Sequence, residues 1–557
     1  MEKESPMSWT LGINTPPLGW HDPSAALVDP EGKVVALVEE ERLSRKKHGL
    51  NRYPIQAARE CIRIAGISPH EIGVVAVGWD FPRHWPRRDR GELNPGLPGR
   101  LWEFDDWKTF VDECLELGYQ QRQPDLIFVP HHVAHAYCAF YASAWESAAV
   151  LVIDGNGDDE SASIFVANRD RRIRRLDRIP VTHSLGYMYD AMCSHIGFSF
   201  LEAGKAMGLA AYGREQPVRL PIFTHTQEGF SPPFSLPTNS EYDVIVGAWR
   251  SYFEQNGFPK ITVDPERLHV SEDAVGLAWS AQAGLEEVVI NLASKARLMT
   301  GETNLCLAGG VALNCSANGL IQEPVFIPPV PHDAGIALGA AWYAVPPKAN
   351  ALLSPYLGTD ISASETEYEI RKVSYPKEVF DPKKAACLIA GGKIGGIVFG
   401  RAEAGPRALG HRSIIASPRS VRIRDQVNER KSREKWRPLS PVSLEGFSNR
   451  YWEQSIHLHR YMIGASRVTE DCRRHAPAVV HVDGTARPFV ISDKSEPLHA
   501  LLSELEAIGH PPILINTSLN NRGEPIVNCV SDALKCAKSV GLDFLIIGDY
   551  LVKLKSC

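Results

Sequence analysis

Long apolar runs are missing from this sequence of 557 residues. No stretch approaches the ~18 consecutive apolar residues that a membrane-spanning helix needs. The amino-terminal residues MEKESPMSW also lack the apolar segment of a signal peptide. These absences predict a cytoplasmic protein that does not insert into a membrane.

Paired cysteines and an excess of positive charge are missing as well. The 11 cysteines are scattered, odd in number and without a CxxC pair, which excludes a disulfide framework and a zinc ribbon and predicts reduced thiols. Because 60 Lys and Arg stand against 66 Asp and Glu, neither nucleic acid nor an anionic membrane is expected as the main partner. There is no Walker A sequence, which disfavours a P-loop ATPase.

The residues that are present predict a duplicated α/β unit. The runs WTLGIN, HDPSAALVD and GKVVALVEE read as three short strands before a charged helix, and the same order returns at AAVLVIDGNG, SASIFVAN and RIRRLDRIPV. Two facing halves form a cleft at the strand ends, where we expect Asn14, His21 and Asp154. Two unrelated hairpin units are the alternative.

A stretch between about 340 and 370 is rich in Pro, Ser, Ala and Gly, which is typical of a linker. We place a domain boundary near 352, giving domains 1–352 and 353–557. Beyond it, KKAACLIAGGKIGGIVFG reads as a helix, a glycine turn and a buried strand, and RPFVI, PPILINTS and DFLIIGDYLV supply further strands. The second domain is therefore expected to be α/β too.

The segment VPHHVAHAY carries the strongest local pattern. His131 and His135 are four residues apart and share one face of a helix, as two ligands of one metal must, although helices also carry such pairs for structural reasons. Asp154 and Asp333 stand at strand-to-loop transitions and would complete a mixed nitrogen and oxygen site. Such a site suits iron, zinc or manganese. Asp154 in DGNGDD could also be a turn residue.

Two further segments indicate anion binding. Gly309 and Gly310 in LAGGVALN lie between a strand and a helix, where backbone N–H groups can approach a phosphate, although tight packing needs such glycines equally often. Eleven Lys and Arg stand against four Asp and Glu between 401 and 437. Arg forks grip phosphates, so we predict a small polyanion pocket, with a solvated face or RNA binding as the alternatives. In ILINTSLNNRGEP, Asn516, Ser518 and Asn520 are donors at a strand end, or caps of a turn.

Ten motifs, in order, resemble one family. HDPSAAL, EEERLSRKKH, HHVAHA, VIDGNGDDE, SLGYMYD, GKAMGLAAYG, LAGGVALN, GPRALGHRS, NERKSREKWRPLSP and NTSLNNRGEP span nearly the whole chain, and together they are similar to the NodU/TobZ carbamoyltransferases. The resemblance implies a duplicated actin-like (ASKHA) N-terminal domain and a smaller YrdC-like α/β C-terminal domain.

The resemblance also implies a two-site reaction. The C-terminal domain would convert carbamoyl phosphate and ATP, with Mg²⁺, to carbamoyl adenylate, and the N-terminal domain would move the carbamoyl group onto a hydroxyl. ATP and carbamoyl phosphate would be bound by Arg407, Lys431, Arg437, Arg487, Asn516, Ser518 and Asn520. Carbamoyl adenylate would contact Lys47, Gly310 and Asn314. His131, His135, Asp154 and Asp333 would hold iron(II) or another divalent transition metal.

The acceptor side depends on fewer residues. The resemblance places His21 at the acceptor, where an imidazole with a pKa near ~6.5 could take the hydroxyl proton; Asp22 is too near in sequence to be assumed its orienter. The loop from about 225 to 249 contains Phe230, Phe234 and Tyr242, which favours a partly apolar natural product such as a macrolide over an aminoglycoside. The aromatics could instead pack the loop. A homodimer is a family-level expectation.

Two rival functions remain open. One is a threonylcarbamoyl adenylate synthase fused to its tRNA transferase, against which the net charge of -6 argues. The other is a regulatory actin-like module that binds ATP without turnover. The metal quartet and the cationic segment disfavour it.

Overall fold

A five-stranded sheet opens the fold. The computed structural model describes residues 8–15, 21–83, 104–116, 123–226, 229–238, 240–454 and 457–554. The first sheet runs in the order β3-β2-β1-β4-β5, with β1 antiparallel to β2 and parallel to β4. Its strands are β1 (Trp9–Asn14), β2 (Ser24–Val28), β3 (Val34–Glu39), β4 (Ile72–Val77) and β5 (Asp125–Phe128). Buried side chains on both faces of β1 and β2 place these strands inside the molecule.

The second sheet repeats the first. Its order is β12-β11-β6-β7-β8, and β6 is antiparallel to β7 and parallel to β11. The strands are β6 (Ser147–Gly157), β7 (Glu160–Asn168), β8 (Arg171–Pro180), β11 (Leu305–Ala308) and β12 (Val325–Phe326). Counted from the start of each half, both sheets have the order 3-2-1-4-5 with the same strand directions. The predicted duplicated unit is therefore confirmed, and two unrelated hairpins are excluded.

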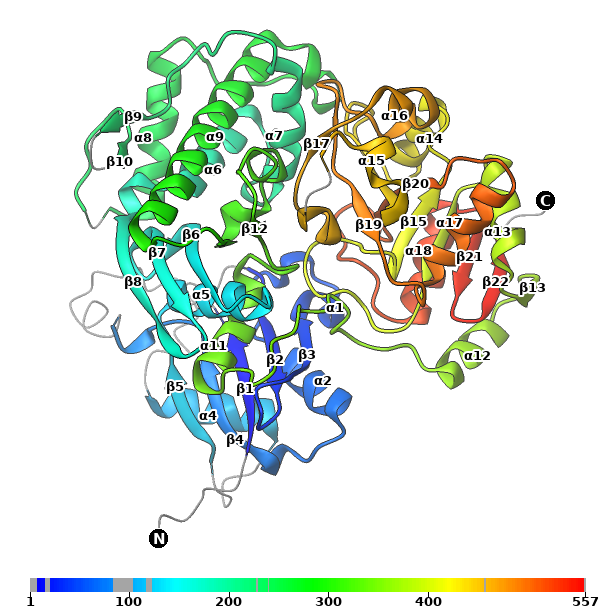
Figure 1. The fold of residues 1–557 in the computed structure, drawn as a ribbon, viewed down its shortest axis with the longest axis horizontal. Coiled ribbons are helices and arrows are strands. Elements are labelled where there is room, and N and C mark those ends of the chain that lie inside the picture. The colour runs from blue at the N-terminus through cyan, green and yellow to red at the C-terminus, as the bar shows by residue number, and fades with distance from the viewer. Residues whose placement is uncertain are drawn as a thin grey trace.

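Two helices fill the space between these sheets. α5 (His131–Ala142) follows β5 and packs on β6 and β11, whereas α11 (Ile336–Ala344) follows β12 and packs on β1, β2 and β4 (Figure 1). The helices approach closely at Gly339, where an added Cβ would lie 1.8 Å from the carbonyl oxygen of Ala134. The amino-terminal turns of α5 and α11 therefore contact each other between the two sheets.

A helical layer covers the second half. It consists of α6 (Leu185–Ile196), α7 (Ala203–Ala210), α8 (Tyr242–Gln255) and α9 (Glu272–Thr300), which lie together beyond the second sheet in Figure 1. Local signals set their ends: Ser184 caps α6 and Ser271 caps α9 through their side chains, and Gly301 ends α9 in a left-handed conformation. The first half is covered by α2 (Ile55–Ala65) and α4 (Phe104–Leu115).

The C-terminal half is built on an eight-stranded mixed sheet in the order β13-β22-β21-β14-β15-β20-β16-β19. The strands are β13 (Lys377–Val379), β14 (Gly395–Val398), β15 (Arg412–Ala416), β16 (Ser440–Leu444), β19 (Phe489–Ile491), β20 (Ile513–Ser518), β21 (Phe544–Ile547) and β22 (Tyr550–Lys553). The successive residues Ile513 and Leu514 of β20 belong to two different apolar clusters, as expected for a sheet covered on both faces. The predicted strands at RPFVI, PPILINTS and DFLIIGDYLV are all present.

Helices cover this sheet on its two faces. α13 (Pro382–Ala390) packs with α17 (Pro497–Ala507), and α12 (Ala363–Arg371) packs with α18 (Val530–Val540). A further helix, α14 (Val421–Arg430), precedes β16. The predicted linker is shorter than the sequence indicated, because residues 340–344 end α11 and residues 363–371 form α12.

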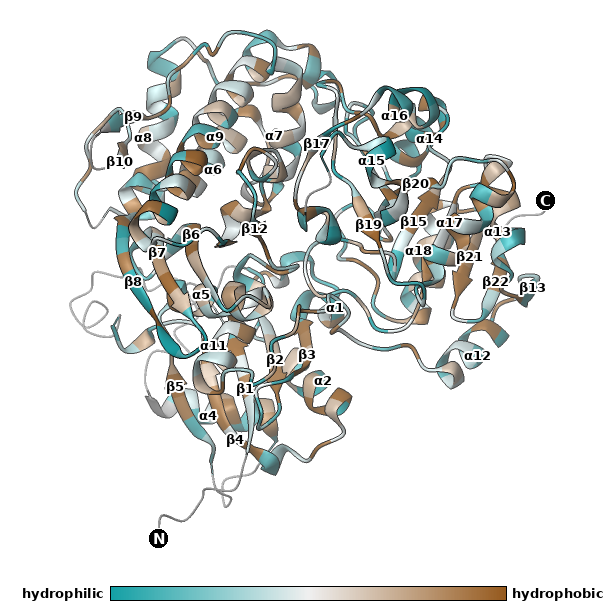
Figure 2. Ribbon diagram, in the orientation of Figure 1, coloured by the Kyte–Doolittle hydropathy of each residue, from teal (hydrophilic) through white to brown (hydrophobic). Residues whose placement is uncertain are grey.

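The surface pattern is polar at the outer edge of the second sheet. Figure 2 shows β8 as one of the most hydrophilic strands, and five of its ten residues are arginine. Charged side chains on an edge strand prevent pairing with another chain. Among the described residues, no helix is both long and apolar enough to cross a bilayer.

Candidate functional site

Four buried side chains converge between the two five-stranded sheets. His131 and His135 come from the first two turns of α5, Asp154 from β6 and Asp333 from the short turn before α11. One ligand atom from each lies within 4.8 Å of all the others. α5, which carries the two histidines, follows the fifth strand of the first sheet, and the turn with Asp333 follows the fifth strand of the second sheet. The duplication therefore brings histidines of the first half against the aspartates of the second.

The spacing of these atoms fits a metal ion. The Nε2 atoms of His131 and His135 are 3.1 Å apart, and each lies 3.2 Å from Oδ2 of Asp154 and 3.6 Å from Oδ1 of Asp333. Ligands at about 2.1 Å from one ion stand roughly 3.0 to 3.4 Å apart in octahedral or tetrahedral geometry. Two imidazoles and two carboxylates suit iron, zinc or manganese.

Asp154 is oriented by the protein backbone. Its Oδ1 accepts N–H bonds from Gly155 at 2.7 Å and Gly310 at 3.1 Å, which leaves Oδ2 facing the histidines. Burial alone would raise the pKa of Asp154, but its hydrogen bonds and attraction to both histidines outweigh burial and hold the pKa well below its usual range. The sequence predicts Asp154 at the end of its strand, but β6 continues to Gly157. Asp154 lies instead at the irregularity after Ile153, where the register of the ladder between β6 and β7 shifts.

A second cluster, the cationic cluster, lies in the C-terminal half and is defined by Arg407, Lys431, Arg433, Arg437 and Arg487, with Lys47 from the N-terminal half. Lys431 contacts the backbone oxygen of Ser518 and lies 2.8 Å from Oδ1 of Asn520. Arg433 donates to Oγ1 of Thr517 at 3.2 Å. The end of β20 therefore holds the base of the cluster.

These cations repel one another. Burial first, and then Arg433, Arg437 and Lys47, hold the pKa of Lys431 well below its usual range. Burial, Arg437 and Arg487 do the same to the pKa of Arg433. Burial and Arg487 lower the pKa of Arg407, and burial, together with Arg437, lowers that of Lys47. Lys431 is buried, Lys47 is exposed, and the four arginines of the cluster are partly exposed. Such a group of like charges is stabilised by a polyanion placed among them.

Short connections join the two clusters. Gly310, which binds Asp154, begins a short 3-10 helix that ends at Leu313, and the carbonyl of Leu313 accepts a bond from Arg407 at 3.2 Å. Three residues of such a helix span about 6 Å. On the other side, Lys205 of α7 binds Glu434 at 3.1 Å, and Glu434 binds Arg437 at 3.3 Å. The clusters therefore face each other across the interface between the two halves.

Two residues expected to bind ligand make hydrogen bonds within the protein. Asn516 donates to the carbonyl of Ala408 at 2.8 Å, whereas its Oδ1 is buried without a hydrogen-bond partner in the described part of the chain. Asn314 caps the helix of residues 315–318 and exchanges two hydrogen bonds with Gln282, at 2.9 and 3.0 Å. Both side chains shape the loops beside the clusters.

The eleven cations between 401 and 437 have different environments, and Arg419, Arg422 and Lys435 are exposed. Arg412 is fully buried and donates to five backbone carbonyls, including those of Phe399 and Asn528, and Arg401 donates to three. These two arginines hold loops together. Arg407, Lys431, Arg433 and Arg437 form the predicted cationic cluster.

Arg433 and Glu434 are functional candidates that the motif comparison missed. Among the described residues, Nε of Arg433 is buried without a hydrogen-bond partner, and Glu434 is the carboxylate through which α7 reaches the cluster. Both stand in the motif NERKSREKWRPLSP, so their position beside Lys431 was the available signal.

The aromatic residues of the expected acceptor loop pack onto the domain. Phe230 contacts Phe223 edge to face with ring centres 5.1 Å apart, and Phe234 contacts Trp249 in the same way at 4.9 Å. Tyr242 meets Tyr187 of α6 at 4.9 Å. The predicted loop is shorter than expected, because residues 242–249 belong to α8. Tyr242, the first residue of α8, remains on the acceptor side, because its partner Tyr187 lies against Gly155 beside the metal cluster.

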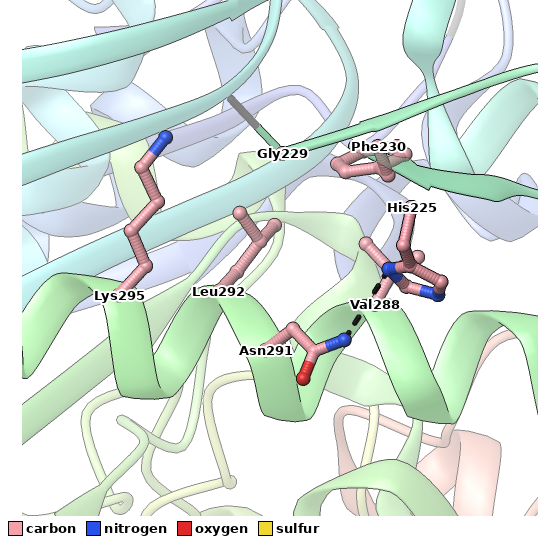
Figure 3. Close-up of a pocket in the computed structure, with 7 residues that line it drawn as sticks. All are labelled: His225, Gly229, Phe230, Val288, Asn291, Leu292 and Lys295. Carbon is pink, nitrogen blue, oxygen red and sulfur yellow. Dashed lines mark hydrogen bonds between the residues drawn. The ribbon is translucent and has the colours of Figure 1, made fainter. Parts of the chain in front are cut away.

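A recess lies between this loop and α9. Figure 3 shows Phe230 and Leu292 forming its apolar wall, with His225, Asn291 and Lys295 at its rim. His225 pairs with Glu287 at 2.9 Å and Lys295 with Asp177 at 2.7 Å. Its polar groups are satisfied within the protein, so the recess does not extend the candidate site.

Comparisons with known proteins agree with the geometry. The model of the carbamoyltransferase N-terminus matches residues 96–342 and that of the carbamoyltransferase C-terminus matches residues 386–554. The nodulation protein NolNO of Sinorhizobium fredii is 32% identical over 97% of this chain and 80% of its own. A 3'-hydroxymethylcephem-O-carbamoyltransferase of Amycolatopsis lactamdurans is 32% identical over 62% of this chain and 64% of its own.

A solved structure of full-length HypF in the phosphate- and nucleotide-bound form is 12% identical, with a TM-score of 0.33 over 62% of this chain and 56% of that one. The family models together cover most of both halves. The chain belongs to the carbamoyltransferase family of the NodU/TobZ type and is a transferase enzyme.

Proposed function

We propose that this protein is an ATP-dependent O-carbamoyltransferase. The cationic cluster forms carbamoyl adenylate from carbamoyl phosphate and ATP, and the metal cluster is the place where the carbamoyl group passes to a hydroxyl of a small-molecule acceptor. The observation that carries the proposal is the pair of facing clusters: cations that lower one another's pKa, within one short helix of four converging metal ligands.

The first half-reaction consumes one water molecule. Carbamoyl phosphate is hydrolysed to carbamate and phosphate, a carbamate oxygen attacks the α-phosphorus of ATP, and pyrophosphate leaves. Charge moves onto the pyrophosphate oxygens as this bond breaks. Arg437 and Lys431 are placed to neutralise that charge. Lys431 is buried and bonds to Ser518 and Asn520, and the Glu434 carboxylate, 3.3 Å from Arg437, is shared with Lys205.

The second half-reaction transfers the carbamoyl group. The acceptor oxygen bonds to the carbamoyl carbon, AMP leaves, and the hydroxyl proton goes to a base, for which we propose His21. Iron(II) or another divalent metal held by His131, His135, Asp154 and Asp333 would supply Lewis acidity toward the carbamoyl oxygen. The interface that encloses both clusters would keep water from the adenylate.

The acceptor is proposed to be the hydroxyl of a natural product. The cephem enzyme of Amycolatopsis lactamdurans is named for such an acceptor. A partly apolar acceptor, such as a macrolide, is favoured over an aminoglycoside only by Tyr242 and Tyr187, since the other aromatic residues of the loop are used in packing.

The test measures phosphate, pyrophosphate and AMP released from carbamoyl phosphate and ATP by the purified protein without an acceptor. We expect pyrophosphate release that requires carbamoyl phosphate and falls at least 100-fold in Arg437→Ala. Arg422→Ala is the matched control, since Arg422 is an exposed arginine of α14 in the same segment.

Two outcomes would contradict the proposal. Pyrophosphate release that requires bicarbonate and threonine instead of carbamoyl phosphate would identify a threonylcarbamoyl adenylate synthase. Absence of release with every substrate pair, from folded protein loaded with metal, would leave ATP binding without turnover.

A further inference from the structure

Asp22 bridges two histidines beside the metal cluster. Its Oδ2 lies 2.9 Å from Nδ1 of His21, and its Oδ1 lies 3.2 Å from Nδ1 of His48. One carboxylate therefore orients two imidazoles through their equivalent nitrogens. The carboxylate is only 11% exposed, whereas His21 is 31% and His48 26% exposed.

The backbone around Asp22 is held in an uncommon conformation. Asp22 and His48 both have positive φ, at 56° and 59°, and the N–H of Asp22 donates to the carbonyl of His48 at 2.7 Å. Asn14 donates to the carbonyl of Asp22 at 2.8 Å and accepts from Trp79 at 3.0 Å. Left-handed conformations of residues other than glycine cost energy and persist where surrounding contacts determine them.

These contacts connect Asp22 to the metal cluster. Trp79, which fixes Asn14, lies over the ring of the metal ligand His131 with centres 3.9 Å apart. Asn14 ends β1, and His131 begins α5. The position of the carboxylate is thereby tied to that of the metal ligands, as the orientation of a proton-transfer group requires.

We propose that Asp22 and His48 are positioning residues for His21: Asp22 holds the Nδ1–H of His21, so that Nε2 is the atom that receives the acceptor proton, and His48 holds Asp22 in place. The inference rests on the proposed function for the identity of the proton donor. At neutral pH an imidazole with a raised pKa carries a proton on both nitrogens, so Nε2 first releases its proton to solvent. Nε2 then takes the proton of the acceptor oxygen as the bond to the carbamoyl carbon forms and AMP departs. Asp22 keeps its own charge throughout.

Several charged groups surround His21. Asp22 precedes β2, and His48 follows α1 (Glu40–Ser44). The other carboxylates are Asp154 of β6, Asp190 of α6 and Asp333 of the short turn before α11. His332 acts on Asp22 from the same turn as Asp333. Burial alone would lower the pKa of His21, but the bond to Asp22 and the charges of Asp22, Asp333 and Asp154 outweigh burial and raise the pKa to about 9.

The same short segment carries Lys47, the next residue before His48. Burial, and repulsion from Arg437, lower the pKa of Lys47, so Lys47 belongs to the cationic cluster while His48 supports Asp22. Residues 47 and 48 thus connect the anion site with the acceptor base through one peptide bond. A shift of this segment on anion binding would move the carboxylate that orients His21.

The first experiment reads His21 without any turnover. Diethyl pyrocarbonate attacks only neutral imidazole, so the rate of His21 modification, followed by peptide mass mapping between pH 5.5 and 9.5, reports its pKa in the full-length protein. In metal-free protein we expect a midpoint near 9 in the wild type and a lower midpoint in Asp22→Asn, which removes the charge bonded to His21. His48→Ala should shift the midpoint in the same direction, and His48→Gln, which keeps a donor to Asp22, should restore most of it.

The second experiment uses water as the probe acceptor in a single turnover with ATP and carbamoyl phosphate. We expect Asp22→Asn to release pyrophosphate within twofold of the wild type while AMP formation falls at least tenfold. Asp125→Asn, which changes an exposed carboxylate at the start of β5, is the control.

An unchanged modification midpoint in Asp22→Asn, or AMP formation at the rate and pH dependence of the wild type, overturns the positioning role. A wild-type protein that releases no pyrophosphate contradicts the proposed function instead, and the modification midpoints still decide whether Asp22 and His48 hold His21.

Discussion

Arg407 and Arg412 stand five residues apart, Arg407 in a loop and Arg412 at the start of β15, yet they have different environments. Arg412 is surrounded by backbone carbonyls and is fully buried, whereas Arg407 donates to one carbonyl and leaves its Nε without a partner in the described part of the chain. The charge count of the segment predicted a polyanion pocket, but composition cannot separate the arginines that face it from those that close a loop. That difference arises from which carbonyls the tertiary fold brings near.

The metal ligands were easier to predict than their surroundings. The spacing of His131 and His135 and the strand-end position of Asp154 are local patterns, and the four side chains do converge. The bridging of His21 and His48 by Asp22 could not be predicted, because it depends on left-handed backbone at two positions that carry no glycine.

Replacing one ligand should empty the metal cluster. His135→Ala removes a nitrogen whose two carboxylate neighbours lie at 3.2 and 3.6 Å, so we expect bound metal to fall below one tenth of the wild-type content and the melting temperature in the presence of iron(II) to fall to that of chelator-treated wild type. Metal analysis and calorimetry check this. Asp159→Asn, in the turn between β6 and β7, changes a carboxylate that is not one of the four ligands and should retain the metal.

A buried histidine that belongs to neither cluster should control acid stability. His459 is 1% exposed, lies 2.8 Å from Oγ of Ser466, and burial lowers its pKa to about 3. In the unfolded chain this imidazole is protonated below pH ~6.5, whereas in the folded chain it stays neutral down to a much lower pH. The free energy of unfolding therefore falls as the pH drops below ~6.5. Between pH 6.5 and 4.5, His459→Gln should lose about 2 kcal/mol less than the wild type in urea unfolding.

The control for that measurement lies two residues away. His457 is exposed at the start of the same short helix, so His457→Gln should follow the wild-type pH dependence. Equal slopes for His459→Gln and the wild type would show that His459 takes up its proton in the folded state.

At the scale of elements, periodicity and turn residues predicted α5, the six meander strands, β11, β14 and β19 to β22, because these depend on local sequence. They did not predict β4, β5, β12, β13, β15 and β16. The order of the strands was accessible only through the repeated meander, which pairs neighbours in sequence. The parallel pairing of β11 with β6 joins residues about 150 positions apart, and no local pattern specifies such a contact. α9, the longest helix described, lies between motifs and contributes Gln282 beside Asn314.

The turn after β11 should be intolerant of any side chain. Gly309 has a φ of 93°, and an added Cβ would lie 2.1 Å from the carbonyl oxygen of Ile153. Gly257 has a similar φ of 85° with open space around it. Gly257→Ala should cost only the backbone strain, about 1 kcal/mol, whereas Gly309→Ala should cost at least twice as much and also displace Asp154, the residue after Ile153.

Thermal unfolding and metal analysis of this pair separate the two effects. A loss of metal in Gly309→Ala with full retention in Gly257→Ala would assign the turn to support of the metal cluster. Equal melting temperatures for the two variants would mean that β6 gives way without strain.

At the scale of the whole molecule, the two halves are joined by contacts between motifs that are far apart in sequence. Arg45, in the motif EEERLSRKKH, donates to the carbonyls of Ile526 and Pro525. In the opposite direction, Gly405 donates to Glu39. Glu39 lies 3.1 Å from Arg42. Loops that the sequence presents as separate ligand motifs therefore form the interface itself, so interface formation and site formation are one event.

The cationic cluster makes the ligand-free molecule less stable than it could be. Arg433 is repelled by Arg437 and Arg487 and loses hydration on burial, so removing its charge relieves strain in the free protein while weakening the anion site. We expect Arg433→Met to melt at a higher temperature than the wild type without ligand, and to lose most of the stabilisation that pyrophosphate gives the wild type. An occupied site at 100 times its Kd stabilises by about 2.7 kcal/mol.

Scanning calorimetry with and without pyrophosphate measures both parts of this expectation. Arg422→Met, at an exposed position of α14, should change neither. A lower melting temperature for ligand-free Arg433→Met would mean that the bond to Thr517 outweighs the repulsion. A full pyrophosphate response in that variant would remove Arg433 from the anion site. The expected opposite signs follow from one cause, since the repulsion that destabilises the empty cluster is the same free energy that a bound polyanion recovers.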